Sequence, residues 1–275
     1  MPELPEVETT RRGIARRLVG RRVVAVVVRN RDQRWPIPRA LGARLGGQRI
    51  TAVRRRGKYL LVDTAAGSAL VHLGMSGSLC VVAADLAPRK HDHWDLVLDS
   101  GQALRRHDPR RFGALLWIAA DSDEARHPLL AHLGPEPLAL SAKALAEQLA
   151  ARARGRRGAV KQFVMDGKVV VGVGNIYASE ALFAARVRPG RAAGRVTAAE
   201  WLAIARAIQR VLTRAIAKGG TTLRDFAQPD GEPGYFRIKL NVYDRAGEPC
   251  RRCRASIKAR VQGQRATYWC PSCQR

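Results

Sequence analysis

The sequence predicts an α+β protein with an antiparallel β domain first, a helical domain second and a small appendage at the C-terminus. Between residues 22 and 118, short apolar runs alternate with Gly, Pro or Asp, which is typical of an antiparallel sandwich or barrel. After residue 138, apolar residues recur at helical spacing. Residues 237–275 hold ten Lys or Arg against two acids, with little capacity for a core of their own. A chain of 275 residues accommodates about two domains.

The N-terminus predicts a helix over residues 5–19. Val7, Ile14 and Leu18 are close to helical spacing, acids precede the arginines, and a glycine follows as a stop. Pro2 and Glu3 precede this helix, and we expect neither of them to cap it.

Six apolar runs predict the strands of the β domain: VVAVVV, YLLV, ALVHL, SLCVV, DLVLDS and GALLWI. Cys80 lies in one of them, and we expect a thiol inside the domain. HLGPEPL at residues 132–138 is a candidate linker. Three later segments have a helical period: SAKALAEQLAARA, NIYASEALFAARV and AAEWLAIARAIQRVLTRAIAKGG, the last with a Gly-Gly stop.

The charge points to a polyanionic partner. Lys and Arg total 49 against 23 acids, a formal net charge of +26, and 41 of the 49 are Arg. Codon composition can explain part of this excess, but so much self-repulsion opposes compaction unless a polyanion binds. Arg suits phosphate, so nucleic acid is the first interpretation and a membrane surface the second. No apolar run approaches the roughly 20 residues that span a bilayer, and no signal-peptide pattern opens the chain. We therefore expect a cytoplasmic protein.

Four of the five cysteines predict a zinc site. Cys250 and Cys253 form one Cys-x-x-Cys pair, and Cys270 and Cys273 form another after sixteen residues. Two such knuckles aim four thiolates at one tetrahedral ion. A redox Cys-x-x-Cys motif would lie beside a βαβ unit, which this tail lacks. Four cysteines leave no open position for water, so the zinc is expected to be structural.

Two kinds of loop are candidates for contact with a distorted duplex. Residues 168–183 place Gly172 and Gly174 before a helix, with Asn175 as the expected N-cap. Such a helix start binds phosphate, although an ordinary capped helix explains the pattern equally well. The nearby Lys161 and the basic run at 152–157 favour phosphate binding.

The segments HLGMSG at 72–77 and HDPRRFG at 107–113 are glycine-bounded turns, each with a large apolar residue, Met75 or Phe112. Such side chains usually belong to a core. Beside Arg110 and Arg111, they are also candidates for wedges that enter a base stack, as enzymes that act on a flipped base require.

These motifs together resemble bacterial formamidopyrimidine-DNA glycosylase. The resemblance runs in order through MPELPEVET, RRGKYL, HLGMSGSL, KHDHWDL, DPRRFG, HLGPEPL, VVGVGNIYASEALF, GGTTLRDF, GYF and the terminal CRRC…QRATYWCPSC. It implies a β-sandwich domain at 1–133, a helix-two-turns-helix domain at 134–236 and a β-hairpin zinc finger at 237–275. It also implies excision of oxidised purines, namely 8-oxoguanine opposite cytosine and formamidopyrimidines, followed by cleavage of the abasic site in damaged double-stranded DNA.

The resemblance also implies roles for single residues. Pro2, exposed by removal of Met1, matches the family nucleophile, and Glu3 matches the acid/base carboxylate. Lys58 matches the proton donor for β-elimination, and Arg265 the donor associated with δ-elimination. A secondary amine suits this chemistry because it condenses to a cationic iminium, and an N-terminal amine titrates near pH 8.

Other matches concern DNA. Met75, Arg110 and Phe112 match the triad that fills the hole left by the flipped base. Residues 219–236 match the loop that covers that base. The expected DNA contacts are His91, Arg110, Arg111, Arg156, Lys161 and Asn175.

Two alternatives remain open at this point. Enzymes resembling endonuclease VIII share the proline start and the zinc finger and excise oxidised pyrimidines, but they usually carry PEGPE where this chain has PELPE. A non-enzymatic zinc-ribbon protein explains the charge and the cysteines but not the PELPE start. From the family we also expect a monomeric bacterial protein associated with the nucleoid.

Overall fold

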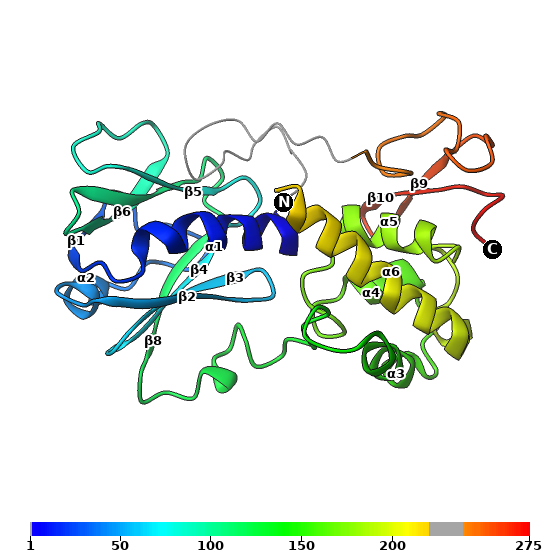
Figure 1. Ribbon diagram of the computed structural model, residues 1–275, viewed down its shortest axis with the longest axis horizontal. Helices are drawn as coiled ribbons and strands as arrows, with labels where there is room; N and C mark the ends of the chain where they lie inside the picture. The colour runs from blue at the N-terminus through cyan, green and yellow to red at the C-terminus, as the bar shows by residue number, and fades with distance from the viewer. Residues whose placement is uncertain (1, 220–238) are drawn as a thin grey trace. The chain divides into compact units, whose positions relative to one another are not determined.

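The computed structural model describes residues 2–219 and 239–275. Their contacts divide the described chain into two compact units, residues 2–131 with Gly219 and residues 132–218 with 239–275 (Figure 1). The C-terminal appendage therefore folds with the helices. Apart from Gly219, the predicted lesion-covering loop lies outside the described residues, as does the predicted boundary between 236 and 237.

The first unit contains two four-stranded antiparallel sheets. One sheet has the order β1 (Val23–Val28), β6 (Asp92–Leu98), β7 (Gln102–His107) and β5 (Ser78–Ala83). The other has the order β2 (Ile50–Arg56), β3 (Tyr59–Thr64), β4 (Gly67–His72) and β8 (Ala114–Ala119). The short helices of this unit are α2 (Leu41–Leu45) and the 3₁₀ turn η1 (Glu124–Arg126).

Both sheets contribute to one apolar core. Leu96 and Leu104 from the first sheet and Leu60 and Val71 from the second are fully buried in the same cluster. A single core between two antiparallel sheets confirms the predicted sandwich. Cys80 is buried in β5, as expected.

Helix α1 (Leu4–Leu18) joins the two sheets. It contacts β2 and β3 of one sheet and β5 of the other, and its Val7, Ile14 and Leu18 are fully buried in the core. The prediction that Glu3 caps nothing is wrong. Glu3 occupies the N-cap position in a capping box with Glu6, whose Oε2 accepts the Glu3 N–H at 2.9 Å.

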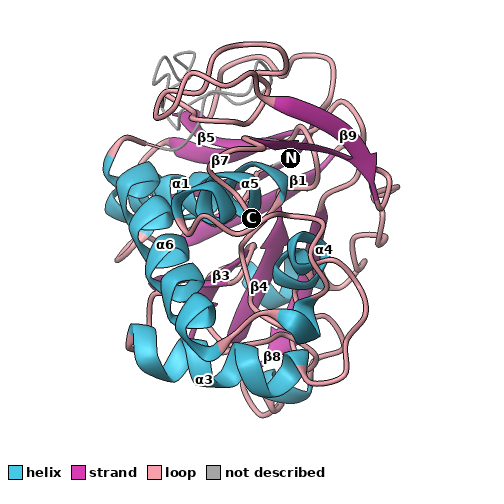
Figure 2. Ribbon diagram, turned by 90° about the vertical axis from the view of Figure 1, so that its right-hand side faces the viewer, coloured by secondary structure: helices cyan, strands magenta, loops and turns pink. Residues whose placement is uncertain are grey.

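The second unit is helical with a terminal hairpin (Figure 2). The three predicted helices form as α3 (Ala142–Ala153), α5 (Asn175–Ala184) and α6 (Ala198–Ala217), and α6 packs against both others. The sequence did not predict α4 (Val160–Met165) or the 3₁₀ turn η2 (Ala193–Arg195). Strands β9 (Lys258–Gln262) and β10 (Arg265–Trp269) pair antiparallel. Among the described residues, no helix has the length and hydropathy that spanning a membrane requires.

One local prediction in this unit needs correction. The N-cap of α5 is Gly174 rather than Asn175, which is the first helical residue. The predicted linker at 132–138 is bonded to the segment that precedes α5. The Gly134 N–H donates to the Gly167 carbonyl over 2.8 Å, and the Val171 N–H donates to Pro135 over 3.2 Å.

Candidate functional site

The N-terminal residues are held by folded structure. Pro2 is buried, and the adjoining Glu3 is 3% exposed. Because Glu3 is the N-cap of α1 and Leu4 is fully buried beneath it, the backbone at Pro2 continues directly from a fixed helix end. A reactive group at Pro2 therefore starts from a defined position.

Lys58 lies at the tip of the β2–β3 hairpin. Arg56 pairs with Tyr59, so Gly57 and Lys58 form a two-residue turn. Gly57 adopts φ 58°, the positive value that a tight hairpin turn requires at its first position. Lys58 is partly exposed there.

Arg55 connects the Lys58 turn to α1, the helix whose N-cap is Glu3. Its Nε donates to Glu8 Oε2 over 3.2 Å, and its Nη1 donates to the Gly57 carbonyl over 3.0 Å. Burial alone would raise the pKa of Glu8, but bonds from Arg11 and Arg12 and the charge of Arg55 outweigh it and lower that pKa to about 2. Glu8 is therefore an anion at neutral pH, and the link is charge-assisted.

His72 is a candidate site residue that the sequence reasoning did not select. It is the Cα partner of Tyr59, next to Lys58, and the two rings lie 4.9 Å apart. Its Nδ1 accepts the Gly74 N–H at 3.1 Å. Burial, followed by the charges of Arg106 and Lys58, lowers the pKa of His72 to about 4. It is therefore neutral at pH 7, with Nε2–H as a donor. The feature of the sequence that could have indicated His72 is its position at the start of the HLGMSG segment.

Residues 72–77 and 107–113, here called the wedge loops, adjoin each other. A Cβ on Gly74 would lie 2.6 Å from the Phe112 carbonyl carbon, so the two backbones are in direct contact there. Phe112 is 42% exposed, unusual for so large an apolar side chain, and the Arg110 guanidinium stacks over its ring at 4.8 Å. Met75 is partly exposed. The loops thus present apolar and cationic side chains together.

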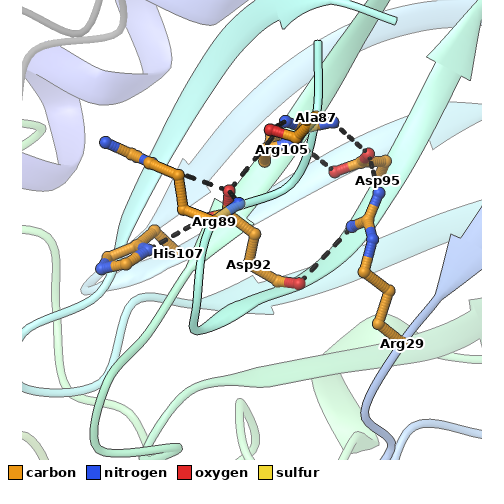
Figure 3. A network of polar contacts seen from close by, with 7 residues as sticks. All are labelled: Arg29, Ala87, Arg89, Asp92, Asp95, Arg105 and His107. Carbon is orange, nitrogen blue, oxygen red and sulfur yellow. Dashed lines mark hydrogen bonds and ion pairs between the residues drawn. The ribbon is translucent and has the colours of Figure 1, made fainter. Parts of the chain in front are cut away.

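The loop that carries His91 is fixed by a buried carboxylate. Asp92 accepts the Arg89 N–H at 2.8 Å and faces His107 Nδ1 at 2.8 Å (Figure 3). His91 itself has φ 77°, an uncommon conformation for a residue with a side chain. The bonds of Asp92 keep the backbone in this conformation and leave the His91 ring partly exposed.

The same network continues into the sheet. Arg105 donates to both carboxylate oxygens of Asp95 and, over 3.2 Å, to the Ala87 carbonyl; Arg29 also bonds Asp95 (Figure 3). Burial alone would raise the pKa of Asp95, but the hydrogen bonds from Arg29 and Arg105 outweigh it and lower the pKa. The His91 loop is therefore anchored to β6 and β7 and to Arg29, which directly follows β1.

Lys161 has a different role from the predicted one. It is 1% exposed, and its Nζ donates to the Ala266 carbonyl over 2.9 Å and to Thr267 Oγ1 over 2.8 Å. A buried ammonium bonded to β10 does not face solvent phosphate. The prediction of Lys161 as a direct DNA contact is therefore corrected: Lys161 fastens the strand that begins at Arg265.

Other predicted contact residues lie at surfaces. Arg111, Arg156 and Arg265 are exposed, and Arg265 follows the tight turn of Gly263 and Gln264 at the hairpin tip. Asn175 is the first residue of α5 and partly exposed. Its Oδ1 is buried without a hydrogen-bond partner in the described part of the chain.

The four C-terminal cysteines fit zinc. Their Sγ atoms all lie within 4.8 Å of one another, with Cys250–Cys273 at 3.9 Å and Cys253–Cys270 at 3.4 Å. Tetrahedral coordination with Zn–S bonds of about 2.3 Å needs sulfurs about 3.8 Å apart. The backbone N–H of Arg252 points at Cys250 Sγ and that of Cys273 at Cys270 Sγ, each at 3.4 Å. These donors suit thiolates, so the site binds one structural zinc ion.

Comparison with known proteins agrees with this arrangement. Three family models match: the formamidopyrimidine-DNA glycosylase N-terminal domain at residues 1–115, its H2TH domain at 133–227, and the zinc finger found in FPG and IleRS at 247–275. A formamidopyrimidine-DNA glycosylase of Thioalkalivibrio sulfidiphilus is 58% identical over 275 residues, 100% of each chain. The chain belongs to the formamidopyrimidine-DNA glycosylase family.

Solved structures of formamidopyrimidine-DNA glycosylases share the fold. The MutM (Fpg) protein of Thermus thermophilus is 39% identical, with a TM-score of 0.86 over 99% of this chain and 98% of that one. A mutant Fpg of Lactococcus lactis in complex with Fapy-dG-containing DNA is 30% identical, with a TM-score of 0.88 over 100% of both chains.

Proposed function

We infer that this formamidopyrimidine-DNA glycosylase family member repairs damaged double-stranded DNA by base excision. It flips out and excises oxidised purines, 8-oxoguanine opposite cytosine and formamidopyrimidines, and then cleaves the abasic site by β,δ-elimination. The observation that carries the proposal is the Arg55 link, since one side chain bonds both α1, whose N-cap is Glu3, and the turn of Lys58. The link thereby connects the part of the fold that carries the Pro2 amine with the turn that carries the Lys58 ammonium, the proposed proton donor.

Pro2 is the proposed nucleophile once Met1 is removed. Its amine nitrogen attacks C1′ of the damaged nucleoside, the glycosidic bond breaks and the base leaves with a proton. Opening of the sugar then gives an iminium between C1′ and the Pro2 nitrogen, which is cationic without a further proton. Glu3, adjacent and 3% exposed, supplies and removes the protons at the sugar oxygen and the amine.

Lys58 and Arg265 are the proposed cations for the eliminations. Lys58 assists departure of the first phosphate and Arg265 that of the second, because positive charge and hydrogen bonds stabilise the leaving anion. Lys58 is the better proton donor, since an Arg side chain is almost never deprotonated. His72, neutral and next to Lys58, adds an Nε2–H donor for a backbone phosphate.

The wedge loops are proposed to fill the hole left by the flipped base. Met75, Arg110 and Phe112 would enter the stack, at an unstacking cost of a few kcal/mol. His91, Arg111, Arg156 and Asn175 are proposed DNA contacts. The net charge of +26 supplies affinity that falls steeply with salt.

Zinc folds the C-terminal module and takes no part in the chemistry. Apart from two of the cysteines, the described part of the module contributes only Val242 and Ile257 to the fully buried part of its apolar cluster, and four thiolates fill the coordination sphere of the ion. The enzyme is proposed to act as a monomer in the bacterial cytoplasm, associated with the nucleoid through its DNA binding.

Borohydride trapping tests the function and its competitors. Duplexes with 8-oxoguanine opposite cytosine, or with an oxidised pyrimidine, are incubated with the protein and reduced, and the covalent adduct is quantified. We expect trapping on the purine lesion in preference. Preferential trapping on the pyrimidine supports an endonuclease VIII-like specificity, and the absence of an adduct on either duplex, with DNA binding retained, supports a non-enzymatic zinc-ribbon protein.

A further inference from the structure

A buried arginine lies beneath the wedge loops. Arg106 in β7 is 1% exposed. Its Nη2 donates to the Leu73 carbonyl over 2.7 Å and to Asp108 Oδ2 over 3.0 Å, and its Nη1 donates to the Ser78 carbonyl over 3.4 Å. Leu73 and Ser78 flank Met75, whereas Asp108 belongs to the loop of Phe112. One guanidinium therefore bonds the bases of both loops.

Asp108 extends the connection within its own loop. Its Oδ2 also accepts the Gly113 N–H at 2.8 Å, closing residues 108–113 around Arg110 and Phe112. The carboxylate is fully buried, and its Oδ1 has no hydrogen-bond partner within the described residues. The Arg106–Asp108 ion pair is thus shielded from water. In such a low-dielectric interior a charge-assisted hydrogen bond is strong, and its geometry is narrowly defined.

Glycines make room for the guanidinium. A Cβ on Gly77 would lie 2.1 Å from Arg106 Nη2, and one on Gly113 would lie 2.3 Å from it. Neither position tolerates a side chain while the guanidinium occupies this space. The last glycine of each wedge loop therefore packs directly on the same charged group.

We propose that Arg106, paired with Asp108, is a positioning residue that locks the two wedge loops into one rigid unit. The proposal rests on the proposed function, in which these loops enter the base stack. A buried ion pair adds little net stability compared with apolar packing, so its effect lies in fixing geometry. Met75, Arg110 and Phe112 then enter the duplex at one step together, rather than as two loops that move independently.

The lock should matter more for some substrates than for others. Excision of a stacked base requires the wedges to offset an unstacking cost of a few kcal/mol. A pre-formed abasic site has no base to extrude, so cleavage there depends less on the placement of the wedges. The ratio of the two rates reports positioning and is insensitive to a general loss of folded protein.

The test compares wild type with Arg106→Met and Arg106→Lys. Single-turnover rates are measured for excision of 8-oxoguanine from a duplex and for cleavage of the same duplex with a pre-formed abasic site. We expect Arg106→Met to lower the excision-to-cleavage ratio by about tenfold to a hundredfold. Arg106→Lys keeps the charge but loses the planar fork, and we expect an intermediate ratio.

Two further variants separate positioning from stability. Leu104→Ala removes a fully buried side chain of β7 that packs in the apolar core, so it lowers stability without touching the wedge loops, and we expect an unchanged ratio. The double variant Arg106→Met/Asp108→Asn avoids a buried unpaired carboxylate while keeping an acceptor for Gly113. It should melt at a higher temperature than Arg106→Met yet keep the lowered ratio.

The outcomes are distinguishable. An unchanged ratio in Arg106→Met, or equal loss of ratio in Leu104→Ala, overturns the positioning role. So does recovery of the ratio with stability in the double variant. If wild-type protein neither excises the lesion nor cleaves the abasic site, the proposed function fails, and the positioning role fails with it.

Discussion

Arg55 and Glu8 form a charge-assisted link, Nε to Oε2 at 3.2 Å, between strand β2 and helix α1. The same guanidinium bonds Gly57 in the turn of Lys58. Replacement of Arg55 by Met should let the turn shift relative to the N-terminus. We expect cleavage of a pre-formed abasic site to slow about tenfold to a hundredfold, because small misplacements of catalytic groups are costly. Single-turnover kinetics with saturating protein measure this.

The control for that variant is Arg12→Met. Arg12 also donates to Glu8, over 2.8 Å, but its side chain is 57% exposed and, among the described residues, it forms no hydrogen bond with the Lys58 turn. We expect a rate within about twofold of wild type, since exposed ion pairs contribute at most about 1 kcal/mol. Equal effects of the two replacements would show that Arg55 acts only through the charge of Glu8.

Acid should destabilise the protein through His72. Burial and then the charges of Arg106, Lys58 and Arg34 lower its pKa to about 4, with Asp108 opposing them. Above the ordinary value of about 6.5, His72 is neutral in both states and its contribution is fully present. As the pH falls from about 6.5 towards 4, only the unfolded state takes up the proton, so stability is lost, at most about 3 kcal/mol.

The measurement for His72 is urea denaturation between pH 7 and pH 4. Protonation would also break the bond from the Gly74 N–H to Nδ1, which holds the start of one wedge loop. In His72→Gln the slope of the unfolding free energy against pH should be smaller, by the contribution of this one proton. The same pH dependence in wild type and His72→Gln would contradict the assignment.

Removal of zinc should unfold the C-terminal module. Structural zinc supplies about 10–16 kcal/mol of apparent folding free energy in small modules. Cys253→Ser should lower the metal content well below one zinc per chain and weaken DNA binding, as checked by elemental analysis and gel shift. Cys80→Ser, outside the cluster in β5, should keep one zinc. A fully active, metal-free protein with disulfides in the tail would contradict this.

Lys161 should act through the hairpin. Its buried bonds to Ala266 and Thr267 are charge-assisted, each worth about 1.5–3 kcal/mol. Lys161→Met should therefore slow the second elimination about tenfold, and Arg265→Ala should add little to it. Product analysis of single and double variants checks this, with the exposed Lys168→Met as control. If the effects of the two replacements on the second elimination were fully additive, Lys161 would act independently of Arg265.

The sequence predicted the elements whose apolar patterns are uninterrupted. Six strands and the four helices α1, α3, α5 and α6 follow such runs. Strands β2 and β7 were missed because arginines interrupt them. In β7, Arg105 and Arg106 are buried against Asp95 and Asp108. A charged side chain is buried only with such a partner, and the local hydrophobic pattern does not show that the partner will be there.

In the functional site too, the sequence predicted features that depend on neighbouring residues and missed contacts between distant ones. The cysteine spacing predicted the zinc cluster because short-range turns determine it. The bonds of Lys161 to β10 and of Arg55 to α1 join positions far apart in the chain. Glu3 as an N-cap was missed because Glu is an unusual capping residue.

The central claim is that the N-terminal proline carries the chemistry. Protein freed of Met1, verified by intact mass, is trapped with borohydride on an 8-oxoguanine duplex, digested and mapped by mass spectrometry. We expect the reduced sugar remnant on the Pro2 nitrogen, and no adduct in protein that retains a residue before Pro2 but still binds DNA. An adduct mapped to Lys58 or another lysine in wild type, or full trapping with Met1 attached, would contradict the claim.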